Sequence, residues 1–311
     1  MKFTIRIPMD IVDPVEFQNA EAVRQMSEAL EKAGADACYI TDHPAPTGHW
    51  LDTGGHDALD PFAGLMMVAA YTKTLRLHTN LIVLPYRNPF ITAKSAATLD
   101  VLSSGRLIMG VGGGYMRGEY EALGADFAGR GARMDEAIKA MKAAWSGEDV
   151  VMEGSAFNAR GIRPRPVPVQ KGGPPIWVGG NSVPAMRRAA TVCDGWSPFF
   201  VAGAMSKGVR TDEIAGLADL KVKIGQLRDM RAAAGRTGPF DICIGPQRPM
   251  AELNAAEADR WINDLGDLAE LGVNWSGCGV PHSSRAAFLD GLQWLSEDVL
   301  PKAKAIRPAS L

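Results

Sequence analysis

The sequence has few cysteines, and their arrangement indicates neither a disulfide framework nor a metal site. Its four cysteines, Cys38, Cys193, Cys243 and Cys278, are far apart, form no C-x-x-C pair and stand within apolar stretches. We therefore expect buried, reduced thiols, and with them a cytoplasmic protein.

Long apolar runs and an excess of charge are also missing. No stretch of about 18 apolar residues occurs, so we expect no membrane span, and the N-terminal segment lacks the apolar stretch of a signal peptide. Lys and Arg number 33 against 35 Asp and Glu, a net charge of −2, which excludes a generally basic nucleic-acid binder and an acidic disordered tail. Neither a Walker A lysine nor a G-x-S-x-G nucleophile elbow is present.

What the sequence does contain is a regular alternation of strand-like and helix-like segments. Short apolar segments predict strands, and each is followed by a segment with helical spacing. The predicted strands are 3–8, 37–41, 75–84, 106–111, 175–178, 195–201, 240–244 and 272–276. The predicted helices are 14–33, 59–73, 91–103, 130–145, 183–192, 212–235, 252–271 and 284–299. Between these units, residues 150–168 predict a hairpin followed by a proline-rich extended arm.

Eight strand–helix units without a linker of biased composition indicate an α/β fold with a parallel sheet. They fit one (β/α)8 TIM barrel with loop insertions at its C-terminal face, so we expect residues 1–311 to form a single domain. An open doubly wound sheet is the alternative. The extra length falls in segments 44–59, 115–129 and 150–174, where barrel enzymes place active-site loops.

Two glycine-rich segments follow predicted strands, at 110–115 (GVGGGY) and 179–182 (GGNS). Without Cβ atoms, their backbone N–H groups can approach an anion closely. The first departs from the dinucleotide fingerprint because Tyr115 stands at its sixth position. The second precedes a predicted helix, capped by Asn181 or Ser182, whose free N–H groups would form an anion site. Either segment alone could be a tight βα turn, but two on consecutive strands indicate a phosphorylated cofactor.

An Asp–His pair follows the second predicted strand. In a barrel, Asp42 and His43 would lie at the C-terminal mouth, where a histidine can move a proton near neutral pH and a carboxylate can fix its tautomer. The alternative is a pair that only caps the loop. His49 and His56 follow in the same segment, but the spacing matches no common zinc pattern, so we expect no metal.

Other polar residues predict structural roles. Glu119, Glu121 and Asp126 follow the triple glycine, and we expect them on a solvated helix face. We expect His78 and His282 to pack or to lie at the surface rather than to bind a ligand.

Several ordered motifs resemble the bacterial luciferase-like oxidoreductases. They are 80–89 (NLIVLPYRNP), 93–106, 110–115, 119–124, 130–134 and 164–180. The resemblance runs over nearly the whole chain, is strongest from 42 to 196 and is weak after 201. Within that superfamily the sequence is most similar to the branch that uses the deazaflavin coenzyme F420, rather than to the flavin monooxygenases that use reduced FMN.

The resemblance implies a TIM barrel, a homodimer, and a hydride- or oxygen-transfer reaction on a small organic substrate. The catalytic residue that it implies is His43, with Asp42 in contact with the deazaflavin. Tyr115, at the position of the family's glutamate acid, is the second catalytic candidate, because it can donate a proton or a hydrogen bond. It implies a cofactor site formed by Asp42, Thr79, Asn80, Leu81, Gly113, Gly114, Tyr115, Gly179, Gly180 and Asn181. In this arrangement residues 79–81 form a strand bulge, where the family often has a non-proline cis peptide behind the ring, and the phosphate lies at 179–181.

The sequence departs from the sugar-phosphate dehydrogenases of that branch at two positions. Tyr115 stands where they have a glutamate acid, and Thr47 where they have a tryptophan, which argues against a glucose 6-phosphate reaction.

The function expected from the sequence is therefore an F420-dependent oxidoreductase in which His43, steadied by Asp42, moves a proton as hydride passes to or from the ring. The alternatives are an FMN-dependent monooxygenase supplied by a separate flavin reductase, and a non-catalytic barrel that binds a flavin or deazaflavin. A zinc hydrolase is a more distant alternative.

Overall fold

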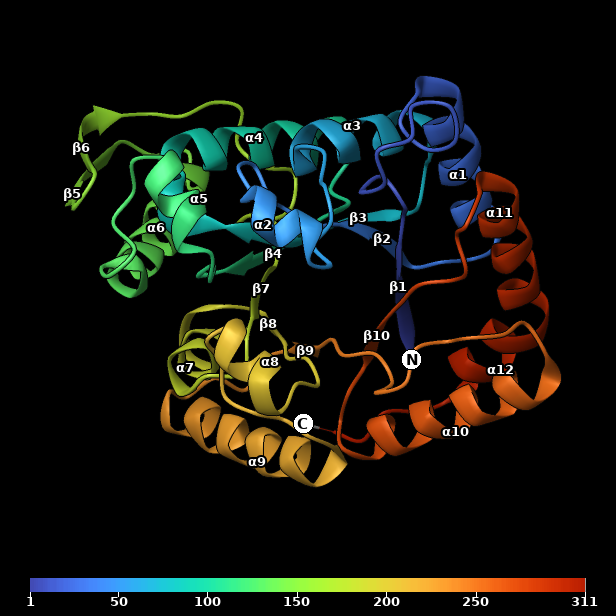
Figure 1. The fold of residues 1–311 in the computed structure, drawn as a ribbon. Coiled ribbons are helices and arrows are strands. Elements are labelled where there is room, and N and C mark those ends of the chain that lie inside the picture. Colours follow the sequence, from blue (N-terminus) through green and yellow to red (C-terminus); the bar gives the residue numbers. More distant parts are fainter. Residues whose placement is uncertain (311) are drawn as a thin grey trace.

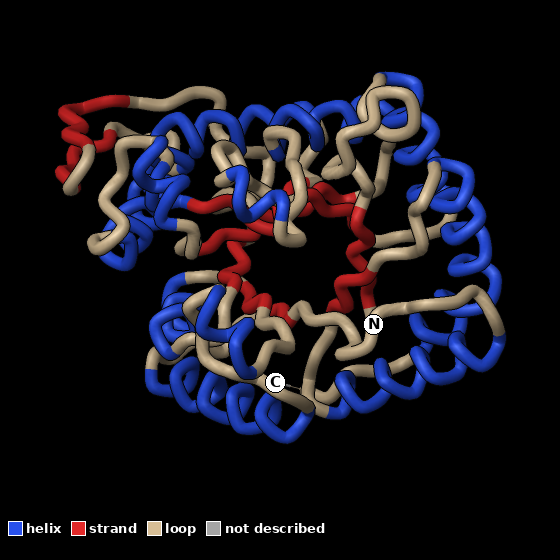
Figure 2. Tube along the Cα trace, viewed as in Figure 1, coloured by secondary structure: helices blue, strands red, loops and turns tan. Residues whose placement is uncertain are grey.

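The computed structural model describes residues 1–310, in which eight parallel strands curve into a ring with helices outside it (Figure 1, Figure 2). The strands are β1 (Lys2–Arg6), β2 (Ala37–Ile40), β3 (Arg76–Val83), β4 (Leu107–Gly112), β7 (Ile176–Gly179), β8 (Gly195–Ser197), β9 (Asp241–Ile242) and β10 (Trp275–Cys278). Their order is β10-β1-β2-β3-β4-β7-β8-β9, and a parallel bridge between Cys243 and Trp275 joins the two ends. The predicted barrel is confirmed, and the doubly wound alternative is wrong.

The helices that follow the strands cover the outside of the barrel, as predicted (Figure 2). They are α1 (Ala20–Lys32), α3 (Pro61–Tyr71), α4 (Pro89–Leu102), α6 (Arg130–Trp145), α7 (Val183–Val192), α9 (Leu217–Ala233), α10 (Ala255–Glu270) and α11 (Arg285–Trp294), which continues through a π-helical turn (Leu295–Val299) into α12 (Leu300–Ala305). The predicted hairpin is also present as β5 (Val150–Gly154) and β6 (Phe157–Ile162), and it projects from the barrel (Figure 1).

Besides α12, four short elements were not predicted, and these four lie in segments that follow strands. They are α2 (Gly48–Asp52), α5 (Arg117–Ala122), α8 (Gly203–Gly208) and a 3-10 turn (Leu84–Tyr86). Because these segments follow β2, β4, β8 and β3, they stand at the C-terminal face of the barrel, which carries the active site in enzymes of this fold.

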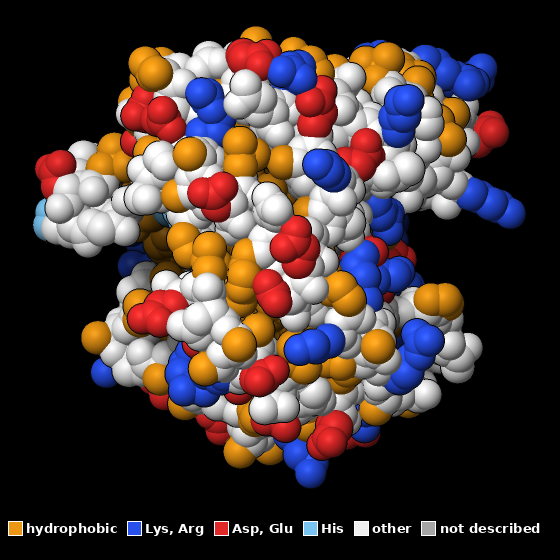
Figure 3. All heavy atoms as spheres, turned by 90° about the vertical axis from the view of Figure 1, so that its right-hand side faces the viewer, with side chains coloured by type: hydrophobic (Ala, Val, Ile, Leu, Met, Phe, Trp, Pro, Cys, Tyr) orange, Lys and Arg blue, Asp and Glu red, His pale blue; other side chains and the backbone are white. Residues whose placement is uncertain are grey.

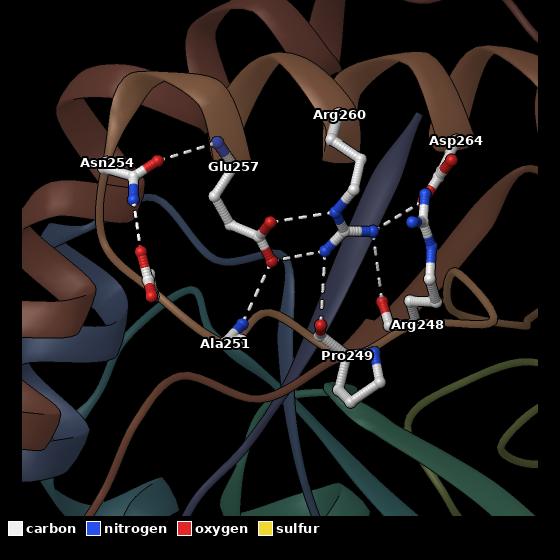
Figure 4. A network of polar contacts seen from close by, with 8 residues as sticks. Arg248, Pro249, Ala251, Asn254, Glu257, Arg260 and Asp264 are labelled. Atoms are coloured by element: carbon white, nitrogen blue, oxygen red, sulfur yellow. Dashed lines mark hydrogen bonds and ion pairs between the residues drawn. The ribbon is translucent and has the colours of Figure 1, made fainter.

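Capping side chains decide where two helices begin. Asn19 accepts a hydrogen bond from the Ala22 N–H at 2.8 Å, so α1 begins at Ala20 and not at the predicted residue 14. Similarly, α10 begins after Asn254, which accepts from the Glu257 N–H at 2.9 Å. The Glu257 carboxylate accepts from the Ala251 N–H at 3.0 Å and pairs with Arg260, as Figure 4 shows.

The main hydrophobic core lies between the strands and the surrounding helices. A smaller cluster of buried side chains fills the inside of the barrel and consists of Ala37, Ile108, Trp177, Cys243 and Trp275. All four cysteines are buried and free, as predicted. No helix within residues 1–310 has both the length and the apolar character needed to cross a membrane. On the outer face that Figure 3 shows, acidic and basic side chains are interspersed without a large field of one sign.

His78 lies beside this inner cluster and is fully buried, where its ring packs against another aromatic ring. Its ring lies 4.9 Å from that of Trp177, and its Nδ1 is 3.3 Å from the Thr4 hydroxyl. Burial, with a smaller contribution from Arg76, lowers the pKa of His78 from 6.5 to about 3.

We therefore expect the protein to lose stability as the pH falls from 6.5 towards about 3. In that window the unfolded chain binds a proton at this residue and the folded chain does not, which costs up to about 1.4 kcal/mol of unfolding free energy per pH unit. Urea unfolding at neutral and mildly acidic pH measures how steeply the free energy of unfolding depends on pH. His78→Gln should flatten this dependence, whereas His49→Gln on the exposed side of α2 should not. Equal slopes in all three proteins would contradict the assignment.

Candidate active site

Glycines leave room on the inner wall at the C-terminal end of β4 and β7. A Cβ atom on Gly110 would lie 1.9 Å from the Thr79 carbonyl oxygen, and one on Gly112 or Gly179 would lie 2.4 or 2.1 Å from the Leu81 side chain. These glycines therefore allow β3 to approach β4 closely and receive the side chain of Leu81.

The three residues of the predicted strand bulge differ in exposure. Thr79 is fully buried and donates a hydrogen bond to the Gly110 carbonyl at 2.9 Å. Asn80 and Leu81 are half-buried, and the peptide bond between them is cis. The register between β3 and β4 shifts between Thr79 and Ile82. The bulge and the non-proline cis peptide that the family resemblance implies are therefore both present.

The first glycine loop presents free backbone donors. The Tyr120 hydroxyl donates to the Gly113 carbonyl at 2.5 Å, and Gly114 has a φ of 63°, which favours glycine. The N–H groups of Gly113, Gly114 and Tyr115 donate to no acceptor among residues 1–310. Successive free N–H groups of this kind form a concavity that suits an anion.

The second glycine loop is held by Asn181, which is fully buried. The Asn181 amide nitrogen donates to the carbonyls of Phe199 at 2.8 Å and Asp212 at 3.0 Å, and its oxygen accepts from the Phe199 N–H at 3.1 Å. The side chain is thus fully engaged with the protein backbone and holds the loop in place. This differs from the expected contact with a cofactor, which in this loop can come from the backbone near Gly180 (φ 105°). Ser182 caps α7, as predicted.

Three arginines surround one aromatic ring between the two glycine loops. The guanidinium carbons of Arg117, Arg130 and Arg210 lie 4.7, 4.1 and 5.2 Å from the centre of the Phe127 ring. None of the three forms an ion pair with a carboxylate among residues 1–310. We call these three residues the arginine cluster.

The arginine cluster is connected to both loops. Phe127 packs against Tyr120, with ring centres 5.1 Å apart, and Tyr120 binds the Gly113 carbonyl. On the other side, Thr211 follows Arg210 in the chain and accepts a hydrogen bond from the Asn181 N–H at 2.9 Å. The arginine cluster is therefore linked to the first loop through Phe127 and Tyr120, and to the second through Thr211.

Asp42 is buried and paired with an arginine that the sequence analysis did not single out. Arg87 Nη2 donates to Oδ1 at 2.6 Å, while Arg87 Nε and the Val83 N–H donate to Oδ2 at 3.2 and 3.1 Å. Burial raises the pKa of the Asp42 carboxyl, against the opposite effects of Arg87 and of the Val83 N–H. Because both oxygens are occupied, the prediction that Asp42 steadies His43 is wrong, and Asp42 instead ties the end of β2 to β3.

His43 instead faces Glu119. The distance from His43 Nδ1 to Glu119 Oε1 is 3.4 Å, and the two side chains are only 12% and 2% exposed. The prediction that Glu119 lies on a solvated helix face is therefore wrong. The burial of Glu119 could not be predicted from sequence. α5 is short, and its charged residues do not indicate which side of the helix faces the protein interior.

Aromatic rings enclose His43 on its other sides. Its ring centre lies 4.5 Å from Trp50 on α2, 5.1 Å from His56 and 6.4 Å from Tyr115. Trp50 stands beside the histidine although Thr47 occupies the position where the resemblance implies a tryptophan. Within residues 1–310, no three His, Cys, Asp or Glu side chains are close enough together to hold a metal ion.

Buried polar atoms without partners support a ligand site at this mouth. Among residues 1–310, no hydrogen-bond partner is present for three hydroxyl oxygens there, Thr41 Oγ1, Tyr86 Oη and Ser197 Oγ. His43 Nδ1 and Glu119 Oε1 also lack one, although they face each other at 3.4 Å. These residues stand at or after the C-terminal ends of β2, β3, β4 and β8. Since an unpaired buried polar group is costly, such a gathering fits a polar ligand. Together with the glycine-lined wall and the free N–H groups, the mouth fits a flat cofactor with an anionic chain.

Comparison with known proteins identifies the family of the chain. The sequence profile of the luciferase-like monooxygenase family matches residues 1–266. An F420-dependent glucose-6-phosphate dehydrogenase of Beutenbergia cavernae is 37% identical, over 88% of this chain and 91% of the relative. The oxygenase component of a flavin-dependent trigonelline monooxygenase of Acinetobacter baylyi is 31% identical, over 57% of this chain and 48% of the relative.

Solved structures share the fold. A monooxygenase of Streptomyces bottropensis superposes with a TM-score of 0.75 at 20% identity and covers 97% of this chain and 99% of that one. The coenzyme F420-dependent tetrahydromethanopterin reductase of Methanopyrus kandleri superposes with a TM-score of 0.72 at 16% identity. The superposition covers 96% of this chain and 98% of the reductase. At these identities the likeness extends to the fold alone.

Proposed function

The chain belongs to the luciferase-like monooxygenase family, and we propose that within it the protein is an oxidoreductase that transfers a hydride between coenzyme F420 and a small organic substrate. The observation that carries the proposal is the position of His43, a proton-exchanging ring enclosed at a glycine-lined barrel mouth. A relative named as F420-dependent covers most of the chain, whereas the flavin-dependent relative covers little more than half of it.

The cofactor would be held mainly by backbone and arginine groups. We assign the ring to the wall formed by Asn80, Leu81 and the glycines of β4 and β7, and its anionic chain to the free N–H groups of Gly113, Gly114 and Tyr115. Beyond them the arginine cluster would receive the phosphate and the carboxylates at the far end of F420. Three unpaired guanidinium groups repel one another, so a polyanion between them is favourable.

When bound, F420 supplies an acceptor or donor for a hydride. The chain itself handles the proton. For an alcohol substrate, His43 would take the hydroxyl proton while the bound cofactor would accept the hydride from carbon, so that a carbonyl is left. In the opposite direction His43 returns the proton. Tyr115 retains its phenolic proton, because burial and the charge of Glu119 raise its pKa, and it can donate a hydrogen bond to the same oxygen.

Turnover without oxygen tests the function. Purified enzyme would be incubated anaerobically with reduced F420 and a panel of small ketones, aldehydes and activated alkenes, and with oxidised F420 and the matching alcohols. We expect a substrate-dependent change in F420 absorbance. Consumption of reduced FMN that requires both oxygen and substrate, with no F420 turnover, would contradict the proposal and favour the monooxygenase.

The arginine cluster gives a separate prediction about affinity. Arg130→Gln should weaken F420 binding about tenfold, because it removes one charged contact. It should leave unchanged the affinity for the deazaflavin chromophore that lacks the phosphate and carboxylates. Arg163→Gln, which removes an exposed arginine paired with Asp149, is the matched control. Fluorescence titration measures both, and equal F420 affinity in the two variants would refute the role of the cluster.

Two other functions remain alternatives with distinct signatures. An FMN-dependent monooxygenase, supported by the relative from Acinetobacter baylyi, would bind reduced FMN, need oxygen and require a flavin reductase partner. A non-catalytic flavin- or deazaflavin-binding barrel would keep cofactor affinity but show no turnover that depends on His43.

We further propose that the protein is a single-domain, cytoplasmic homodimer. The hairpin β5–β6 and α4 carry exposed apolar side chains, among them Val151 (77% exposed) and Ile91 (69% exposed). Phe90 and Phe157 pack the hairpin against α4, with ring centres 5.2 Å apart. An apolar surface of this kind supports association with a second copy.

A further inference from the structure

We propose that Glu119 is a positioning residue for His43: its carboxylate keeps a proton on Nδ1 and so leaves Nε2 to exchange a proton with the substrate. The catalytic consequence rests on the proposed function. The tautomer of His43, in contrast, is a property of the chain and can be measured without cofactor or substrate.

The geometry isolates the two groups from other partners. Glu119 lies in the first turn of α5 and is 2% exposed. Among residues 1–310 its carboxylate has no lysine or arginine within ion-pair distance, and His43 is its sole ion-pair neighbour. Glu119 Oε1 and His43 Nδ1 are both sealed from solvent, and neither has another hydrogen-bond partner in this part of the chain.

The energetics favour a proton between these two atoms. A buried carboxylate without a cation or a donor costs several kcal/mol, and the group placed to offset that cost is Nδ1 of His43. Their separation of 3.4 Å is long for a hydrogen bond, but catalytic hydrogen bonds often tighten when the ligand binds. A neutral imidazole with its proton on Nδ1 carries its acceptor lone pair on Nε2.

The other groups around His43 cannot take this role. Asp42, although adjacent in the chain, accepts from Arg87 and the Val83 N–H and forms no ion pair with His43 among residues 1–310. The remaining charged or titratable groups that face His43 or its neighbours are His56, Tyr115, Tyr86 and Asp10, and Asp10 pairs with His56 at 3.7 Å. Burial raises the pKa of both tyrosines, and Glu119 raises them further, so both phenols stay neutral.

Nitrogen-15 NMR of the apoprotein tests the tautomer directly. The chain has five histidines, so the His43 signals can be assigned with His43→Gln. We expect a neutral His43 with its proton on Nδ1 in the wild type, and a larger share of the Nε2-protonated tautomer in Glu119→Gln. A neutral ring protonated on Nε2 in the wild type, or the same tautomer in both proteins, would overturn the proposal.

Kinetics test the consequence. Glu119→Gln should lower kcat about 10- to 100-fold, a usual effect of removing a second-layer partner, and move the acidic limb of the pH–rate profile to lower pH. F420 affinity should not change. Glu121→Gln on the exposed side of the same helix is the matched control, and Glu119→Asp replaces the glutamine variant if that variant does not fold. Unaltered kcat and pH profile would refute the proposal. If the wild type fails to bind F420, the proposed function fails while the NMR result still decides the tautomer.

Discussion

His43→Gln is expected to lower kcat about 10²- to 10⁴-fold, the range that general acid–base groups contribute. Glutamine keeps a polar side chain of similar reach, but it cannot accept and release a proton near neutral pH. Cofactor affinity should change little, because the anionic end of F420 is assigned to the loops and arginines beyond Gly113. Steady-state kinetics and fluorescence titration of the same preparation separate the two effects.

The matched control is His49→Gln, because His49 lies exposed on α2 within the same segment. It should retain wild-type turnover. If His43→Gln turned over as fast as the wild type, His43 would have no part in the mechanism. If F420 affinity alone fell, His43 would be a binding residue, and the non-catalytic reading of the mouth would gain support.

Arg87→Met is expected to lower the free energy of unfolding by about 3–5 kcal/mol, as when a buried ion pair loses one partner. Arg87 is the cation that neutralises Asp42, which is buried and otherwise receives only the Val83 N–H. Arg163→Met should cost at most about 1 kcal/mol, because Arg163 and Asp149 are half exposed and screened by water. Urea unfolding of the two variants gives the comparison.

The decrease in the free energy of unfolding caused by Arg87→Met should also depend on pH. Burial already raises the pKa of Asp42, and removal of Arg87 takes away the charge that opposes this. An acid with a raised pKa in the folded state destabilises the fold as the pH rises above its unfolded value. The variant should therefore lose more stability at mildly alkaline than at mildly acidic pH. A deficit that does not grow with pH would contradict a further rise in the pKa of the Asp42 carboxyl on loss of Arg87.

The barrel could be predicted from sequence because its signals are local and repeated. Apolar strands followed by helical spacing, with glycines and prolines between them, recur eight times, and the structure confirms all eight units. The observed helices start at other residues than predicted where a capping side chain fixes the first turn, as Asn19 does for α1 and Asn254 for α10. The short helices α2 and α5 escaped prediction because fewer than two turns carry little periodicity.

The location of the candidate site residues could be predicted from sequence, but the side chains that they contact could not. His43 and the glycine loops follow strands, and the bulge at residues 79–81 lies in the C-terminal half of β3, so they meet at the C-terminal mouth. The partners were wrong because they depend on tertiary packing: Arg87 reaches Asp42 from beyond β3, and Glu119 reaches His43 from α5. Neighbours in sequence, such as Asp42 and His43, point to different partners in the fold.

The most direct test of the account is a fluorescence titration of the purified apoprotein with F420 and with FMN, each oxidised and reduced. The account predicts tight binding of F420 and weaker binding of FMN, since the arginine cluster offers more positive charge than a single phosphate requires. Preferential binding of reduced FMN would contradict it and assign the protein to the oxygen-dependent members of the family. Binding of neither would leave the barrel standing without the proposed function.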